Sequence, residues 1–101
     1  MKLVFSSVFE QDFAELVAFF SREHSPELAA RFEQNTYALI EQLMTQREIG
    51  RLRKDLNPEG VRSFRVRGFE RYLLFYLLRG DELVLLRLRY GGMNLQALFL
   101  A

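Results

Sequence analysis

The chain has 101 residues, half of them hydrophobic, with a formal net charge of +1, one histidine and no cysteine. This length predicts one domain, residues 1–101, around a single hydrophobic core. The lack of cysteine excludes a disulfide framework and a cysteine-based metal site, and one histidine excludes a histidine-rich cluster, so we expect neither a metal nor a cofactor.

The N-terminal residues predict a short strand at Leu3–Phe5 that ends at Ser6 and Ser7. They contain no apolar run of the kind that a signal peptide needs. No apolar stretch in the chain approaches the roughly 20 residues that span a bilayer. We therefore expect a cytoplasmic protein without membrane contact.

Two helices are predicted next. The spacing Ser7-Val8-Phe9-Glu10 fits a capping box, in which a serine hydroxyl accepts a first-turn amide and the glutamate reaches back. The apolar stripe of this helix comprises Phe9, Phe13, Leu16, Val17 and Phe20. A second helix starts with Ser25 as N-cap and Pro26 at the first helical position, and it continues to about Gln46. The two helices are expected to form a hairpin that turns near His24.

Residues 47–60 are polar, contain Gly50, Pro58 and Gly60, and show no sustained period. They predict a long connecting loop. Loops of this length are uncommon in compact domains and are often functional. The alternative is a plain crossover, which the chain needs in any case to return from the helices to a sheet.

Three strands are predicted at Val61–Arg67, Tyr72–Leu78 and Leu83–Tyr90, and their short connections force an antiparallel meander. Along the first and last strands, hydrophobic residues alternate with arginines, so each kind is expected on its own face. The hydrophobic set comprises Phe64, Val66, Leu86 and Leu88. The basic set comprises Arg65, Arg67, Arg87 and Arg89.

The central strand, Tyr72–Leu78, is apolar on both faces. One face is expected to pack on the helical hairpin, and the other needs a cover as well. The cover is either the C-terminal segment after Gly92, where residues 94–99 predict one or two helical turns, or a segment of another chain.

Charge is unevenly distributed along the chain. Residues 1–46 carry three basic and seven acidic side chains, whereas residues 47–72 carry eight basic and four acidic ones. The basic part either faces phosphates or an acidic partner, or it is a solvated surface.

Several local motifs follow one another in this order of elements. They are carried by Ser6, Asp12, Phe13, Ser25, Pro26, Ala29, Ala30, Phe32 and Gly50, then by an arginine-rich strand at 61–66 and an aromatic run at 72–76. Together they resemble the RelE/ParE superfamily of bacterial toxins, and most of all its ParE branch. The resemblance implies an α+β fold, with an N-terminal strand and a helical hairpin packed on an antiparallel sheet and a short C-terminal helical turn.

The resemblance further implies a toxin of a type II toxin–antitoxin module, of the kind associated with plasmid stabilisation. Such a toxin inhibits DNA gyrase by trapping its cleaved DNA complex, and a cognate ParD-like antitoxin neutralises it in a hetero-oligomer. For target binding we expect the basic set of the sheet, Arg65, Arg67, Arg87 and Arg89. For antitoxin binding we expect hydrophobic residues that the core covers only in part, namely Phe19, Leu73, Phe75, Leu77, Leu83 and Leu85.

The alternatives are a RelE-like ribosome-dependent mRNA endonuclease and an inactive antitoxin-binding module. A nuclease needs a group that moves protons, and Tyr90 stands where many relatives have a histidine. Its pKa, near 10 when unperturbed, would have to fall. Arg65 and Arg87 would then hold the phosphate. His24 is expected to be a solvated residue at the tip of the helical hairpin.

Overall fold

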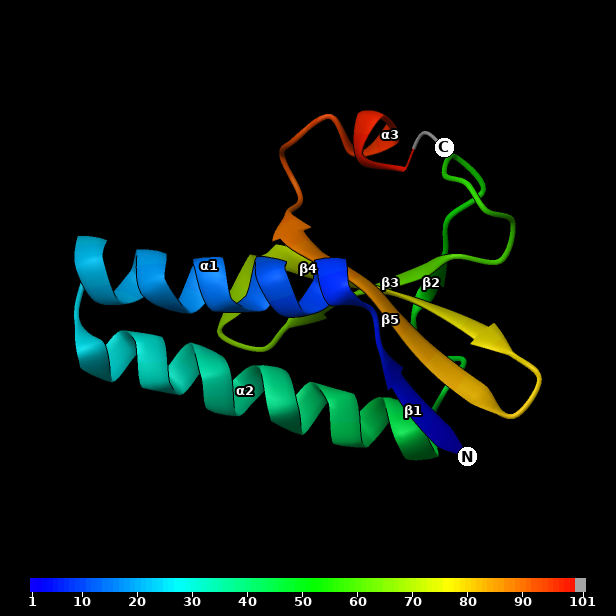
Figure 1. Ribbon diagram of the computed structural model, residues 1–101, viewed down its shortest axis with the longest axis horizontal. Helices are drawn as coiled ribbons and strands as arrows, with labels where there is room; N and C mark the ends of the chain where they lie inside the picture. Colours follow the sequence, from blue (N-terminus) through cyan, green and yellow to red (C-terminus); the bar gives the residue numbers. More distant parts are fainter. Residues whose placement is uncertain (100–101) are drawn as a thin grey trace.

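The computed structural model describes residues 1–99. Its elements in chain order are β1 (Lys2–Phe5), α1 (Ser7–Glu23), α2 (Pro26–Thr45), β2 (Arg51–Leu52), β3 (Arg62–Val66), β4 (Phe69–Arg79), β5 (Glu82–Tyr90) and α3 (Leu95–Leu98). Figure 1 shows α1 and α2 side by side, with α3 at the top beside the loop that leads from β2 to β3. No helix within residues 1–99 is long and apolar enough to cross a membrane.

The sheet has the strand order β1-β5-β4-β3-β2. Strands β3, β4 and β5 form the antiparallel meander that the short connections predicted. Strand β1 pairs in parallel with β5, with Leu3 opposite Leu83, so the sheet is mixed and not purely antiparallel. The four residues of β1 contain no pattern that identifies a partner strand some 80 positions away. This pairing was therefore not predicted from the sequence.

The helix starts follow local capping signals, with one correction. Ser6, not Ser7, caps α1: its hydroxyl oxygen accepts the Phe9 amide at 3.0 Å, and the same hydroxyl donates to the carbonyl of Leu86 at 3.1 Å. This second bond ties α1 to β5, which explains why Ser6 takes the position. At α2 the prediction is confirmed, because Ser25 accepts the Leu28 amide at 3.1 Å.

A β-bulge between Phe75 and Tyr76 changes which side chains share a face. Phe75 pairs with Arg87, but Tyr76 pairs with Leu85, so Leu86 has no partner on β4. Leu86 consequently packs in the cluster around Phe75 and not beside Leu88, which lies in the core under the helices. The predicted alternation is wrong at this residue.

The sheet is covered on both faces. On one face an aromatic core joins α1, α2 and β4, and it includes the buried side chains of Phe9, Phe13, Phe20 and Phe32. On the other face Phe75 packs with Leu56, Val61 and Phe99, and the rings of Phe75 and Phe99 lie 5.2 Å apart. The C-terminal segment is therefore a cover of the second face, one of the two alternatives that the sequence left open.

The crossover between α2 and β3 is not a plain loop, since it contains β2, with Arg51 opposite Ser63. The hydroxyl of Tyr76 anchors its start by accepting the Gly50 amide at 2.9 Å and donating to the Arg47 carbonyl at 2.7 Å. A Cβ on Gly50 would lie 2.5 Å from this hydroxyl, so a larger residue would displace the anchor. Tyr76 thus fixes the entry to β2.

Replacing Tyr76 by phenylalanine should lower the free energy of unfolding by about 1–3 kcal/mol, because the buried Gly50 amide loses its acceptor. Burial raises the pKa of Tyr76, so the hydroxyl keeps the proton that it donates to Arg47. Urea unfolding followed by circular dichroism measures the cost, and Tyr37→Phe, at a half-exposed ring, is the matched control. Equal stability of the two variants would show that the anchor contributes nothing.

Candidate functional site

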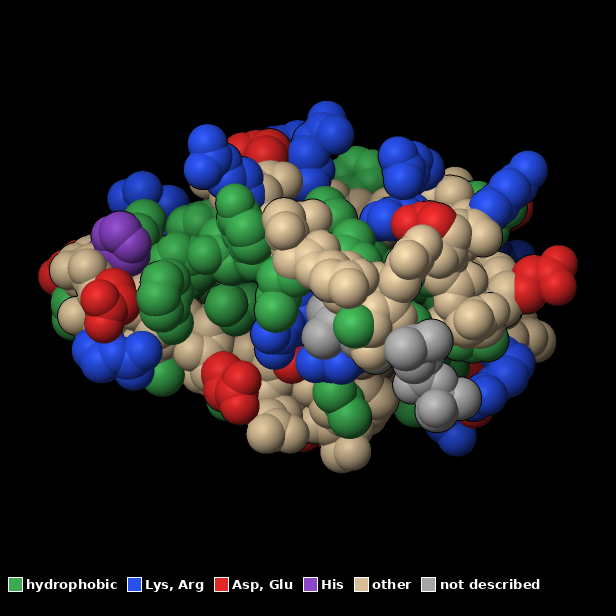
Figure 2. Space-filling view, turned by 90° about the horizontal axis from the view of Figure 1, so that it is seen from above, with side chains coloured by type: hydrophobic (Ala, Val, Ile, Leu, Met, Phe, Trp, Pro, Cys, Tyr) green, Lys and Arg blue, Asp and Glu red, His purple; other side chains and the backbone are tan. Residues whose placement is uncertain are grey.

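The sheet register brings together most of the arginines that the sequence singled out. Arg65 lies opposite Leu73, and Leu73 lies opposite Arg89, so these side chains form one row on the face that points away from the helical hairpin. Arg87, opposite Phe75, lies on the same face. In Figure 2, Lys and Arg side chains follow the upper edge of the view, and hydrophobic side chains gather below them on the left.

Arg67 does not join this row. Strand β3 ends at Val66 after a register shift, and Arg67 lies in the turn to β4, where Gly68 has a φ of 82°. The side chain of Asn35 on α2 donates to the Arg67 carbonyl at 2.9 Å. The prediction that all of the basic set shares one face is therefore wrong for Arg67, because the bulge and the tight turn interrupt the alternation.

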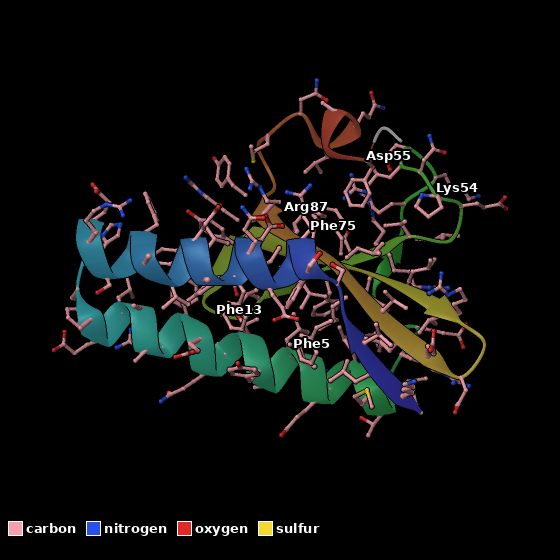
Figure 3. The ribbon with its side chains drawn as sticks, viewed as in Figure 1. Phe5, Phe13, Lys54, Asp55, Phe75 and Arg87 are labelled. Carbon is pink, nitrogen blue, oxygen red and sulfur yellow. The ribbon has the colours of Figure 1, made fainter. Side chains whose placement is uncertain are left out.

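Asp12 holds two of these arginines at the edge of β5. The Arg87 guanidinium donates to both of its carboxylate oxygens, at 2.7 and 3.0 Å, and Arg89 donates at 3.2 Å. The same carboxylate accepts the Leu88 amide at 3.1 Å, beyond the end of β1, where only the β4 side of β5 is still paired with a strand. Figure 3 shows Arg87 beside α1. Asp12 is only 3% exposed, so this cluster, the Asp12 cluster, fixes α1 to the sheet.

A hollow of about 540 Å³ opens beside the arginine row. We call it the basic hollow. Its lining includes Arg51, Arg53, Ser63, Arg65, Leu73 and Leu95. Arg51 lies opposite Ser63 on the neighbouring strand, and Arg65 is two residues further along β3, so these three side chains share one face. Of this set, Arg65 and Leu73 were predicted as binding residues from the sequence. The excess of basic residues in 47–72 was the signal for Arg51 and Arg53, whereas no pattern indicated Ser63 or Leu95.

Arg53 is the fixed cation of the basic hollow, with 7% of the residue exposed. Its guanidinium donates to both carboxylate oxygens of Asp55, at 3.0 and 2.8 Å, and to the Ser63 hydroxyl at 3.2 Å. It also lies 5.8 Å from the centre of the Phe75 ring. The hydrogen bonds from Arg53 hold the pKa of Asp55 below its ordinary value. Asp55 therefore stays ionised and keeps Arg53 in place.

Arg51 and Arg65, in contrast, are exposed, and neither forms a salt bridge within residues 1–99. The guanidinium of Arg65 lies 5.9 Å from the centre of the Phe64 ring. These two cations are the ones available to an anionic ligand. No group of three or more metal-binding side chains occurs in the described part of the chain.

The residues considered for RNA cleavage are not brought together. Tyr90 pairs with Tyr72, their rings 5.7 Å apart, and Tyr72 packs against Phe20 in the core under the helices. Tyr90 thus lies on the opposite face of the sheet from Arg65, and Arg87 is held by Asp12. His24 is an exposed residue at the end of α1, as expected.

The expected antitoxin contacts are only partly accessible. Phe75, Leu83 and Leu85 are fully buried, so the prediction that the core covers them incompletely is wrong. The pairing with β1 and the bulge place Leu83 and Leu85 under the helices, and the C-terminal segment covers Phe75. The half-buried residues of that set are Phe19, Leu73 and Leu77.

A second, more apolar cavity is a groove between the two helices. Its volume is about 770 Å³, and its lining includes Phe5, Phe13, Val17 and Tyr37. Figure 3 shows Phe5 and Phe13 on the side of α1 that faces α2. Tyr37 is 50% exposed and Phe5 38%. The acidic side chains in the lining are Glu10 and Glu33. We call this surface the helical groove.

Comparisons with known proteins agree with this architecture. Residues 3–95 match the family model described as ParE toxin of the type II toxin–antitoxin system parDE. A solved chain from the chromosomal ParDE toxin–antitoxin system of P. aeruginosa superposes with a TM-score of 0.75 at 18% sequence identity. The similarity covers 89% of this chain and 95% of that one, and at this identity it shows the fold alone. No curated protein sequence matches the chain significantly.

Proposed function

The chain belongs to the ParE toxin family of type II toxin–antitoxin systems, and from this premise we propose that it inhibits DNA gyrase by binding and that a cognate ParD-like antitoxin neutralises it. The observation that carries the proposal is the family match, which spans residues 3–95. The toxin acts in the cytoplasm, where both gyrase and the antitoxin are located. Its target surface is the arginine row of the sheet together with the basic hollow.

The geometry supports binding over RNA cleavage. A ribonuclease of this kind must remove a proton from a 2′-hydroxyl while it holds the phosphate, so its proton-transfer group and its cations have to meet at one point. Tyr90 and Arg65 lie on opposite faces of the sheet. The free arginines can bind an anionic surface, but Tyr90 does not accompany them there.

The helical groove is the surface that we assign to the antitoxin. Its exposed aromatic side chains, Phe5 and Tyr37, suit the apolar face of an amphipathic helix. Glu10 and Glu33 flank them, and residues 1–46 carry a large excess of acidic side chains. The occupant is therefore an antitoxin helix with Lys or Arg on both sides of its apolar stripe, which also keeps this apolar surface away from water.

The test induces the chain and its Tyr90→Phe variant separately in a bacterial host. Both should cause filamentation and linearised plasmid, because removal of one hydroxyl leaves the arginine surface intact. Co-expression of the antitoxin encoded beside the toxin should restore growth. Southern blots of plasmid DNA and sequencing of mRNA ends measure the two outcomes.

A nuclease gives the opposite pattern. If Tyr90 transfers a proton, its conversion to phenylalanine should lower mRNA cleavage by about 10² or more. Rapid mRNA cleavage by the unaltered chain, lost in a folded Tyr90→Phe protein that still binds the antitoxin, would overturn the gyrase proposal. A chain without any growth effect would instead be an inactive antitoxin-binding module.

A further inference from the structure

The basic hollow carries more positive charge than its own carboxylates neutralise. Among the described residues, Arg53 alone of its three arginines has a carboxylate partner, Asp55. The acidic residue in its lining, Glu70, uses a carboxylate oxygen to accept the Gly68 amide at 2.7 Å. Arg51 and Arg65 therefore leave a local excess of positive charge in a concave surface, which concentrates anions.

Three of the cations share one face of the sheet, with Arg65 and Arg89 in register and Arg51 offset by two residues. Arg51 on β2, Arg65 on β3 and Arg89 on β5 project from the same face of the sheet, with Leu73 between Arg65 and Arg89. Arg65 and Arg89 are two strands apart, which corresponds to about 10 Å between their backbones. A row of this kind follows a chain of repeated negative charges better than a single small anion.

The hollow has the donors that such a chain needs. Arg53 is oriented in advance by Asp55, and its Nη1 donates to the Ser63 hydroxyl oxygen, which leaves the hydroxyl hydrogen to point elsewhere. Guanidinium groups match the oxygens of a phosphodiester in a forked geometry. The apolar side chains of Leu73 and Leu95 in the same lining can pack against the sugars that lie between the phosphates.

We propose that the basic hollow binds the phosphodiester backbone of DNA. The inference rests on the proposed function, since it names the component of the gyrase–DNA complex that the arginine row contacts. Phosphate contacts position a protein on DNA without reading its sequence, so the toxin holds DNA of any sequence at this site. Arg51 and Arg65 supply the charge, and Arg53 and Ser63 supply the fixed donors.

The experiment titrates the purified chain into a fluorescently labelled DNA oligonucleotide, without gyrase, over a series of salt concentrations. Arg51→Ala and Arg65→Ala should each weaken binding about tenfold at low salt, and each should reduce the salt slope by about one. Arg31→Ala is the control, because Arg31 is an exposed residue of α2 that carries the same charge outside the hollow. It should leave affinity and slope unchanged.

Three results would overturn the assignment. Equal losses in the Arg31, Arg51 and Arg65 variants would mean that binding depends on total charge alone. Tighter binding of an RNA of the same sequence, or of a polyglutamate peptide, through Arg51 and Arg65 would assign the hollow to RNA or to an acidic protein surface. Absence of any salt-dependent DNA binding by the unaltered chain would remove the site. Circular dichroism confirms that each variant is folded.

Failure of the inference is distinguishable from failure of the proposed function. A gyrase cleavage assay with purified components reports trapped linear DNA independently of the titration. A toxin that traps gyrase while its Arg51 and Arg65 variants bind DNA unchanged refutes the hollow alone. A toxin that binds DNA through these arginines but traps no gyrase complex refutes the proposed function alone.

Discussion

Replacing Phe32 by alanine should lower the free energy of unfolding by about 3–5 kcal/mol. Phe32 is fully buried, and its ring lies 4.9 Å from that of Phe20, 5.1 Å from Phe69 and 5.9 Å from Tyr72. It thus connects α2 with α1 and β4 at the centre of the aromatic core. Removing the ring leaves a cavity where α1, α2 and β4 pack against one another. A domain of this size is stable by about 5–15 kcal/mol, so the variant should lose a large share of its stability.

Urea denaturation monitored by circular dichroism measures this cost. Glu41→Ala, an exposed position of the same helix, is the control and should change stability by less than about 0.5 kcal/mol. Phe13→Ala should behave like Phe32→Ala, because Phe13 is 8% exposed and packs 6.2 Å from Phe32. A cost below about 1 kcal/mol at Phe32 would mean that the helices do not pack as described.

Local signals explain what the sequence predicted well. The second helix begins and ends within one residue of its predicted bounds. Its start is set locally, because Ser25 accepts a first-turn amide and Pro26 has the backbone angle of a first helical residue. The meander follows from connections too short for anything but antiparallel neighbours. In both cases the determining interactions lie within a few residues, where a sequence pattern is informative.

Features set by distant contacts were not predictable in the same way. The bulge at Phe75 and Tyr76 places Leu86 on the other face of the sheet, and no residue type in that stretch indicates a bulge. Ser6 outcompetes Ser7 as N-cap through a bond to a carbonyl 80 residues away. Arg67 leaves the arginine row because the turn at Gly68 starts one residue earlier than the pattern indicates. Each error comes from a contact that the fold creates.

The site was predicted in part for the same reason. Alternation along single strands identified Arg65 and Arg89, which the register places in one row with Leu73 between them. Arg51 lies on the same face because β2 pairs with β3, directly after the Tyr76 anchor at Gly50. An isolated two-residue strand in a polar segment has no recognisable period. The basic hollow could therefore be suspected from charge but not assembled from sequence.

The Asp12 cluster carries the second large expected effect: Asp12→Ala should cost about 3 kcal/mol of stability. The carboxylate compensates two guanidinium groups and accepts the Leu88 amide, and the substitution leaves all three donors without it. The side chains of Arg87 and Arg89 are 19% and 25% exposed, so water reaches them and the cost stays at the lower end for a broken buried ion pair. Glu10→Ala, an exposed position of the same helix, is the control.

A double-mutant cycle separates the ion pair from mere packing. If Asp12 serves to compensate Arg87, the Asp12→Ala, Arg87→Ala double variant should lose clearly less stability than the sum of the single changes. Chemical denaturation of the four proteins gives the coupling energy, which we expect to exceed about 1 kcal/mol for a bidentate contact with a buried carboxylate. Strict additivity would show that Asp12 stabilises α1 in some other way.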